Sequence, residues 1–154
     1  MDTFAHAIWS FIIFYATGNI WLAIFFGIMP DLFSWTIYLF YAIATGKMKK
    51  EFRRPDLDAL PNWIHVLYGL THSVFVIALV FVLVFLFTRQ IPIYLWAWPL
   101  HVLIDIPTHS RKMLPTPFLW PVFDWKFPGF SWGQTWFMAL NYIGIVVALI
   151  FIFL

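Results

Sequence analysis

The chain has 154 residues, of which 63% are hydrophobic, 23% aromatic and only 10% charged, and its net charge is +2. Its mean hydropathy of +0.86 and its scarcity of charge exclude an ordinary soluble domain, in which about 25% of residues are charged. The absence of cysteine excludes disulfides and thiolate metal sites. We therefore expect an all-α, polytopic membrane bundle, with residues 1–154 forming one domain and no cleaved secretory leader.

The first apolar run covers residues 4–29, with Gly18 and Asn19 at its middle. It is either one span or two short helices that fold back at this pair. Pro30 is expected to end the run, because proline disfavours helix in the residue before it and suits the first turn of a new helix.

The next elements follow the same apolar pattern. Residues 31–45 predict a short helix that Gly46 ends. A basic loop at 47–61 comes next, and residues 62–88 predict the longest uninterrupted helix.

Two further helices are predicted, at 92–106 and 134–154, with a loop at 107–133 between them. The chain as a whole thus predicts four to five membrane-inserted segments.

Eight of the nine Lys and Arg residues fall in the 47–61 and 107–133 loops, and Arg89 is the ninth. Positive charge concentrates in cytoplasmic loops, so we expect both loops in the cytoplasm and the C-terminus on the other side, in a prokaryotic plasma membrane. The lipid bilayer is the expected partner. Nucleic acid is not expected, because no aromatic binding platform accompanies the basic loop.

Ionisable residues inside or at the edges of apolar segments are the candidate functional groups. They are His6, Asp31, His72, His101, Asp105 and His109. An ionisable group at the centre of a span costs about 2.5–3.5 kcal/mol on insertion scales, so such groups face protein or water. Histidine and aspartate together suit Zn²⁺ or Mn²⁺ better than a soft metal.

Spacing adds to this interpretation at one end of the 92–106 helix. His101 and Asp105 lie one helical turn apart, and therefore on one face. Pro107 is expected to interrupt the helix just after Asp105, which lets His109 return towards the site or face the interface. His72 sits in a Thr-His-Ser triplet that recurs at 108–110.

Each residue taken alone also has a structural interpretation. His72 and His6 are then interhelical hydrogen-bond partners or interfacial groups, and His101 with Asp105 is a self-satisfied pair. Asp31 is then the acidic start of a helix. The conjunction of several such groups favours a metal site.

Four stretches together resemble the small integral-membrane proteins described as predicted membrane-bound metal-dependent hydrolases. They are "HAIWSF", "GIMPDLFSW", "LYGLTHSVF" and "HVLIDIPTHSRKMLPTPFLWPVFDWKFPGFSWG". That family is distantly similar to the all-helical zinc-dependent phospholipase C and single-strand nuclease fold. The resemblance implies these metal ligands: His6, Asp31, His72, His101 and Asp105. The sequence of this chain departs from the family's pattern at Phe33 and at Leu67-Tyr68.

The sequence therefore predicts a divalent-metal-dependent hydrolase, with Zn²⁺ or Mn²⁺ as cofactor and an ester or phosphoester of a lipid-like molecule as substrate. Asp31 or Asp105, whichever is not tied to the metal, is the expected general base, and His109 the acid or an orienting group. The alternative is a non-enzymatic protein, either a small ion or metal transporter or a helical scaffold that binds a partner.

Overall fold

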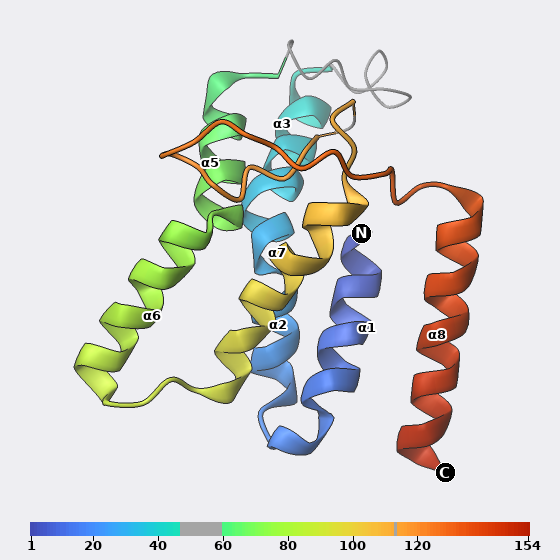
Figure 1. The fold of residues 1–154 in the computed structure, drawn as a ribbon. Coiled ribbons are helices and arrows are strands. Elements are labelled where there is room, and N and C mark those ends of the chain that lie inside the picture. The colour runs from blue at the N-terminus through green and yellow to red at the C-terminus, as the bar shows by residue number, and fades with distance from the viewer. Residues whose placement is uncertain (47–59, 113) are drawn as a thin grey trace.

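All regular structure in the described residues is helical (Figure 1). The computed structural model describes residues 1–46, 60–112 and 114–154, so most of the basic 47–61 loop lies outside the described residues. The elements are α1 (Thr3–Phe14), η1 (Tyr15–Thr17), α2 (Ile20–Asp31), η2 (Leu32–Thr36), α3 (Ile37–Ala44), α5 (Asn62–His72), α6 (Val74–Thr88), η4 (Ile93–Trp96), α7 (Ala97–Thr108) and α8 (Thr135–Phe153). The expected all-α class is confirmed.

The first apolar run folds into two helices, which decides between the two alternatives left by the sequence. Gly18 ends η1 with a φ of 74°, a left-handed conformation that glycine adopts without the strain of a side chain. The chain then reverses, and α2 packs along α1 (Figure 1). At Gly27 a Cβ atom would lie 1.9 Å from Ser10 Oγ, so this glycine permits the close approach of the two helices.

Pro30 does not end the helix, contrary to the expectation from the sequence. It lies inside α2, and α2, η2 and α3 continue as one apolar helix from Ile20 to Ala44. The widened π-type turn of η2 begins at Leu32, two residues after the proline, and Ser34 Oγ donates a hydrogen bond of 2.6 Å to Pro30 O. Local π-type adjustments of this kind allow an apolar helix to continue past an internal proline. Asp31 is therefore a residue of the helix interior and does not start a helix.

The predicted uninterrupted helix at 62–88 is also wrong, because Ser73 divides it. Ser73 is extended, with φ −84° and ψ 130°, and α5 and α6 meet there at 53°. Its hydroxyl accepts a hydrogen bond of 3.1 Å from Phe75 N and donates to Trp120 O. Serine is a favoured residue at a helix start. Within the Thr-His-Ser triplet, His72 is therefore the last residue of α5 and Ser73 begins α6.

Pro107 lies within the last turn of α7, which continues to Thr108 instead of ending at Ile106. The segment after α7 then crosses this helix end. Phe130 N donates to Pro107 O and Trp132 N to Thr108 O, each at 2.9 Å. A Cβ atom at Gly129 would lie 2.5 Å from Pro107 O, so the contact requires glycine there.

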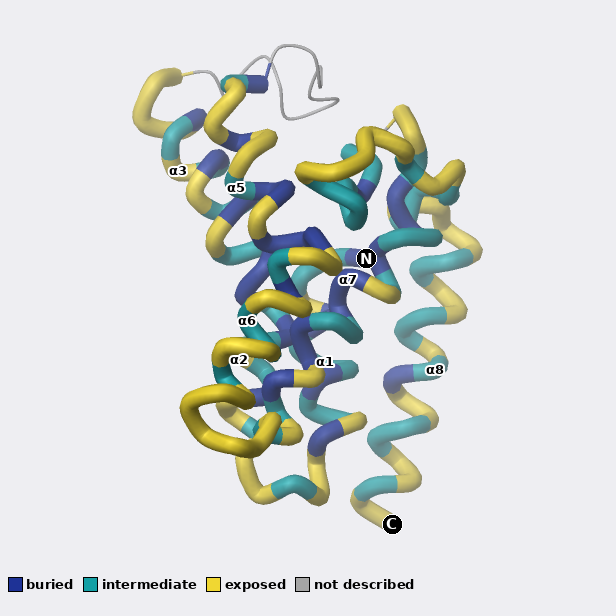
Figure 2. Tube along the Cα trace, turned by 60° about the vertical axis from the view of Figure 1, so that its left-hand side comes forward, coloured by how far each residue is buried: buried dark blue, intermediate teal, exposed yellow. Residues whose placement is uncertain are grey.

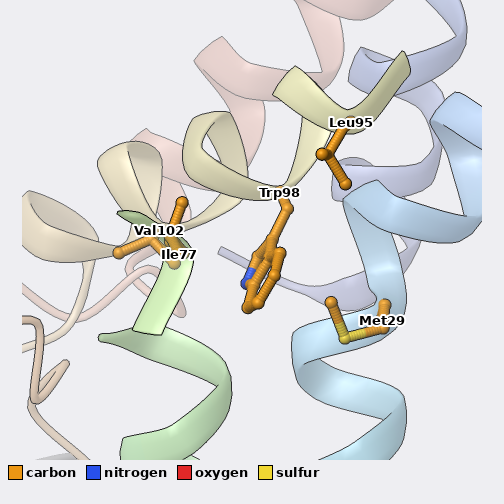
Figure 3. Close-up of a cluster of buried hydrophobic side chains, with 5 residues drawn as sticks. All are labelled: Met29, Ile77, Leu95, Trp98 and Val102. Atoms are coloured by element: carbon orange, nitrogen blue, oxygen red, sulfur yellow. The ribbon is translucent and has the colours of Figure 1, made fainter. Parts of the chain in front are cut away.

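A buried apolar cluster lies between α2, η4, α6 and α7 (Figure 3). Its members are Met29, Ile77, Leu95, Trp98 and Val102. The Trp98 ring lies at its centre, and its Nε1 donates a hydrogen bond of 2.7 Å to Thr71 O. The cluster thereby ties the C-terminal end of α5 to α7.

Two helices are long and apolar enough to cross a membrane, Ile20–Ala44 and Thr135–Phe153, and the bent pair α5–α6 is a third if it counts as one span. Of the four to five membrane-inserted segments expected from the sequence, two to three are thus long enough among the described residues to cross a membrane. With a rise of 1.5 Å per residue, the twelve-residue helices α1 and α7 reach about 18 Å, short of a hydrocarbon core of about 30 Å. Large apolar side chains are exposed along α6 and α8 (Figure 2), as expected for surfaces that face lipid.

Different segments of the chain lie at the two ends of the helical bundle (Figure 1). The end of α3, the start of α5 and the segment 109–134 lie at one end. The C-terminus and the turn that contains Arg89 lie at the other. This arrangement is compatible with the predicted orientation of the basic loops, while their cytoplasmic location stays a prediction.

Candidate metal centre

Four ionisable side chains from three helices converge inside the bundle. Asp31 comes from the end of α2, His72 from the end of α5, and His101 with Asp105 from α7. One ligand atom from each lies within 4.8 Å of all the others. Both imidazoles and Asp105 are buried, and the Asp31 side chain is 14% exposed.

The hydrogen bonds of the two imidazoles fix which nitrogen of each ring faces the group. His101 Nδ1 lies 2.7 Å from Gly27 O, and His72 Nδ1 lies 3.1 Å from Tyr68 O. A carbonyl oxygen only accepts, so each Nδ1 carries a proton, and in the neutral form of each ring Nε2 presents a lone pair. A metal-bound histidine usually has this arrangement, with its second nitrogen donating to a carbonyl or a carboxylate.

The distances between the facing atoms match the edges of a metal coordination sphere. His72 Nε2 and His101 Nε2 are 3.3 Å apart. Two nitrogens bound tetrahedrally at 2.0–2.1 Å from a zinc ion lie about 3.3 Å from each other. Two lone pairs at this separation repel unless a cation lies between them. A proton or a metal ion between the two Nε2 atoms is therefore needed to hold them at this distance.

The two carboxylates approach the same point. Asp105 Oδ2 lies 3.2 Å from His101 Nε2 and 3.8 Å from His72 Nε2. Asp31 Oδ1 lies 3.8 Å from His101 Nε2. Two imidazole nitrogens and two carboxylate oxygens are borderline and hard donors, a set that suits Zn²⁺ or Mn²⁺. The residues present thus fit the metal that the sequence predicts.

The second carboxylate oxygen of Asp105, Oδ1, contacts residues that are not among the four candidate ligands. Asp105 Oδ1 lies 2.9 Å from His6 Nε2 and 3.5 Å from His109 Nδ1, and the α-amino group of Met1 donates to it. His6 also stacks on the His101 ring, with ring centroids 3.7 Å apart. These contacts fix the carboxylate so that Oδ2 points at the imidazoles.

His109 lies just beyond the end of α7, next to Asp105. Burial lowers the pKa of His109 below its ordinary value, while the neighbouring Asp105 carboxylate acts to raise it. The His109 Nδ1 atom is 3.2 Å from Asp105 O. In its neutral form, an imidazole at this place donates a hydrogen bond through one nitrogen and accepts one through the other.

Asp31 is held by a residue that the sequence did not single out. Thr3 Oγ1 donates a hydrogen bond of 2.5 Å to Asp31 Oδ2, which leaves Oδ1 facing His101. The bond joins the first turn of α1 to the middle of the long helix. It also orients the most exposed of the four side chains.

Comparisons of this chain with protein-family models, curated proteins and solved structures give no match. What the site is able to do is therefore inferred from its geometry.

The structure brings Asp31, His72, His101 and Asp105 together, and it places His6 and His109 around Asp105. The other residues of the two Thr-His-Ser triplets have structural roles: Thr71 Oγ1 lies 3.0 Å from His72 Nδ1, Ser73 starts α6, and Thr108 Oγ1 accepts from Met1 N.

Sequence reasoning missed several contributing residues, among them Thr3, Gly27 and Tyr68. Thr3 and Tyr68 gave no signal in the sequence, because a hydroxyl or a carbonyl is recognised as a supporting group only when the fold shows what lies beside it. Gly27 did offer one, since a glycine inside an apolar helix indicates close approach of another element.

Proposed function

We propose that this chain is a membrane-embedded, metal-dependent hydrolase that acts on an ester or phosphoester of a lipid-like substrate. The observation that carries the proposal is the pair of Nε2 atoms 3.3 Å apart, with two carboxylate oxygens directed at the same point. The four residues are among the five metal ligands that the resemblance implies, and His6, the fifth, contacts Asp105 Oδ1 instead.

His72 Nε2, His101 Nε2 and Asp105 Oδ2 would hold the ion in this proposal. Three protein ligands with one position open are typical of catalytic zinc sites. The ion supplies Lewis acidity, which lowers the pKa of a bound water and polarises the scissile bond.

Asp31 would be beside a water held by the ion, because its Oδ1 lies 3.8 Å from His101 Nε2 and its side chain is the least buried of the four. We assign it the role of general base, which accepts the proton of the attacking water. Thr3 keeps the other oxygen of this carboxylate engaged, so Oδ1 is the atom that takes the proton. We assign His109, beside Asp105, the role of donating a proton to the leaving oxygen, which it would do in its protonated imidazolium form.

An apolar groove beside the site supports an amphiphilic substrate. It has a volume of about 540 Å³ and is lined by side chains of α1, α6 and α7 and of Trp96. Val74 and Val102 belong to its wall, and they lie next in sequence to Ser73 and His101. A hydrocarbon chain in this groove would lie against α7, the helix that carries His101 and Asp105.

Metal binding is tested by elemental analysis of the detergent-purified protein. We expect about one equivalent of Zn²⁺ or Mn²⁺ in the wild type and its loss in His101→Ala, with His65→Ala as a matched histidine control, since this exposed imidazole lies outside the ligand group. Equal metal content in wild type and His101→Ala would refute the site. A pair of imidazoles that shares only a proton would give no metal in either.

Catalysis is tested in vesicles of phosphatidylglycerol and phosphatidylethanolamine that contain the reconstituted protein. Mass spectrometry should detect a water-soluble or fatty-acid product that accumulates with Zn²⁺ and stops after chelation. A metal-loaded protein that releases no product from these lipids, and instead equilibrates Zn²⁺ across the vesicle membrane, would favour the transporter alternative.

A further inference from the structure

A second cavity opens between the start of α5 and the segment that follows α7. It has a volume of about 770 Å³, and Tyr68, Arg111, Leu114, Trp120, Trp125 and Lys126 are among the residues that line it. This cleft lies at the end of the molecule where the 109–134 segment crosses α5 (Figure 1).

The charge in the cleft centres on Arg111. Its Nε and Nη2 atoms donate to Lys126 O at 3.3 and 3.2 Å, so the side chain lies against the cleft wall. No carboxylate among the described residues forms an ion pair with it, whereas Lys126 Nζ pairs with Asp124 Oδ1 at 3.1 Å. A guanidinium presents several donors in one plane and matches the oxygens of a phosphate.

Aromatic side chains border this positive charge. Trp125 is 52% exposed and the neighbouring Phe123 61%, and both line the cleft together with Trp120. Tryptophan is enriched at the level of lipid headgroups, where its ring meets both apolar and polar surroundings. The cleft therefore has the composition of a membrane interface.

Tyr68 connects the cleft to the metal ligands. It lines the cleft, its hydroxyl donates to Leu114 O at 3.3 Å, and its ring centroid lies 4.1 Å from that of His72. Trp120 packs over the adjacent Gly69, where a Cβ atom would lie 2.7 Å from the indole ring. One side chain thus separates the bottom of the cleft from a proposed metal ligand.

We propose that this cleft binds a phosphate group, carried by the headgroup of the lipid substrate, through Arg111. That this lipid is a substrate rests on the proposed function, but its binding to the cleft requires neither metal nor turnover. The headgroup would enter from the interface, with Tyr68 as the side chain that separates it from His72.

The test is native mass spectrometry of the metal-free protein in detergent, with phosphatidylglycerol and, as the phosphate-free counterpart, diacylglycerol. We expect phosphatidylglycerol to bind more tightly, and Arg111→Gln to weaken its binding about tenfold or more, since a hydrogen bond to a charged group is lost. Lys112→Gln is the matched control, because this exposed neighbour does not line the cleft, and it should bind as the wild type does.

Equal binding by Arg111→Gln and wild type would overturn the proposal, as would equal binding of the two lipids. Arg111-dependent binding of glycerol 3-phosphate as tight as that of the lipid would keep the phosphate site but assign it to a soluble phosphoester. His101→Ala should lose the metal but still bind phosphatidylglycerol. The proposed metal site and the proposed phosphate cleft can therefore be refuted separately.

Discussion

Replacement of Asp31 by asparagine tests whether this residue is a general base or a metal ligand. Asparagine keeps the size of the side chain and its position in the long helix but cannot accept the proton of the attacking water. Loss of a general base lowers turnover by about 10²- to 10⁴-fold, or about 2.7–5.5 kcal/mol in activation free energy. The three proposed ligands remain in Asp31→Asn, so we expect metal content close to that of the wild type.

Thr3→Val extends this test to the hydrogen bond that orients Asp31. The lost bond joins a hydroxyl to a carboxylate at 2.5 Å, and a hydrogen bond to a charged group contributes about 1.5–3 kcal/mol. The carboxylate itself remains, so turnover should fall by about 10- to 100-fold, less than in Asp31→Asn. Thr17→Val is the control, because the Thr17 hydroxyl donates only to Phe14 O in its own turn.

Both variants are measured in the vesicle assay, with metal content determined on the same samples. Turnover of Asp31→Asn within threefold of the wild type would refute its role as base. Loss of metal as complete as in His101→Ala would instead make Asp31 a ligand.

Three further predictions concern the fold around the site. Gly27→Ala should lower both metal content and thermal stability, because the added methyl meets Ser10 Oγ at 1.9 Å and displaces the helix whose carbonyl holds His101; a wild-type melting temperature and metal content would contradict this. Gly129→Ala should destabilise the protein by about 1–3 kcal/mol in thermal unfolding, because its Cβ would overlap backbone carbonyls at 2.5 Å; unchanged stability would show that this contact is dispensable. A reporter inserted after Lys50 should be cytoplasmic and one at the C-terminus should be on the other side, given the positive charge of the basic loops; the reverse result would refute the orientation.

Composition and spacing alone determined the class of this protein and most of its candidate residues. An apolar chain with few charges cannot leave histidine and aspartate in lipid without a cost, and this rule selected the four residues that converge. The i,i+4 spacing of His101 and Asp105 placed both on one face because helix geometry is fixed locally.

Local rules failed at Pro30 and at Ser73. Pro30 was expected to end a helix, but the helix continues past it through a π-type turn. Ser73 lies in a strongly apolar stretch that predicts a continuous helix, and its bond to Trp120 O comes from a segment about fifty residues away. Hydropathy contains no information about such partners.

The tertiary structure alone decided how the candidate residues meet. The sequence did not reveal that Gly27 O and Tyr68 O hold the Nδ1 atoms, and so turn both Nε2 atoms to one point. Nor did it distinguish the two carboxylates, which differ because Asp105 is buried among several donors while Asp31 has one hydroxyl partner and partial exposure. These features depend on distances between helices far apart in the chain, and the physical reason is that a short-range pattern fixes the face of a helix but not what packs against it.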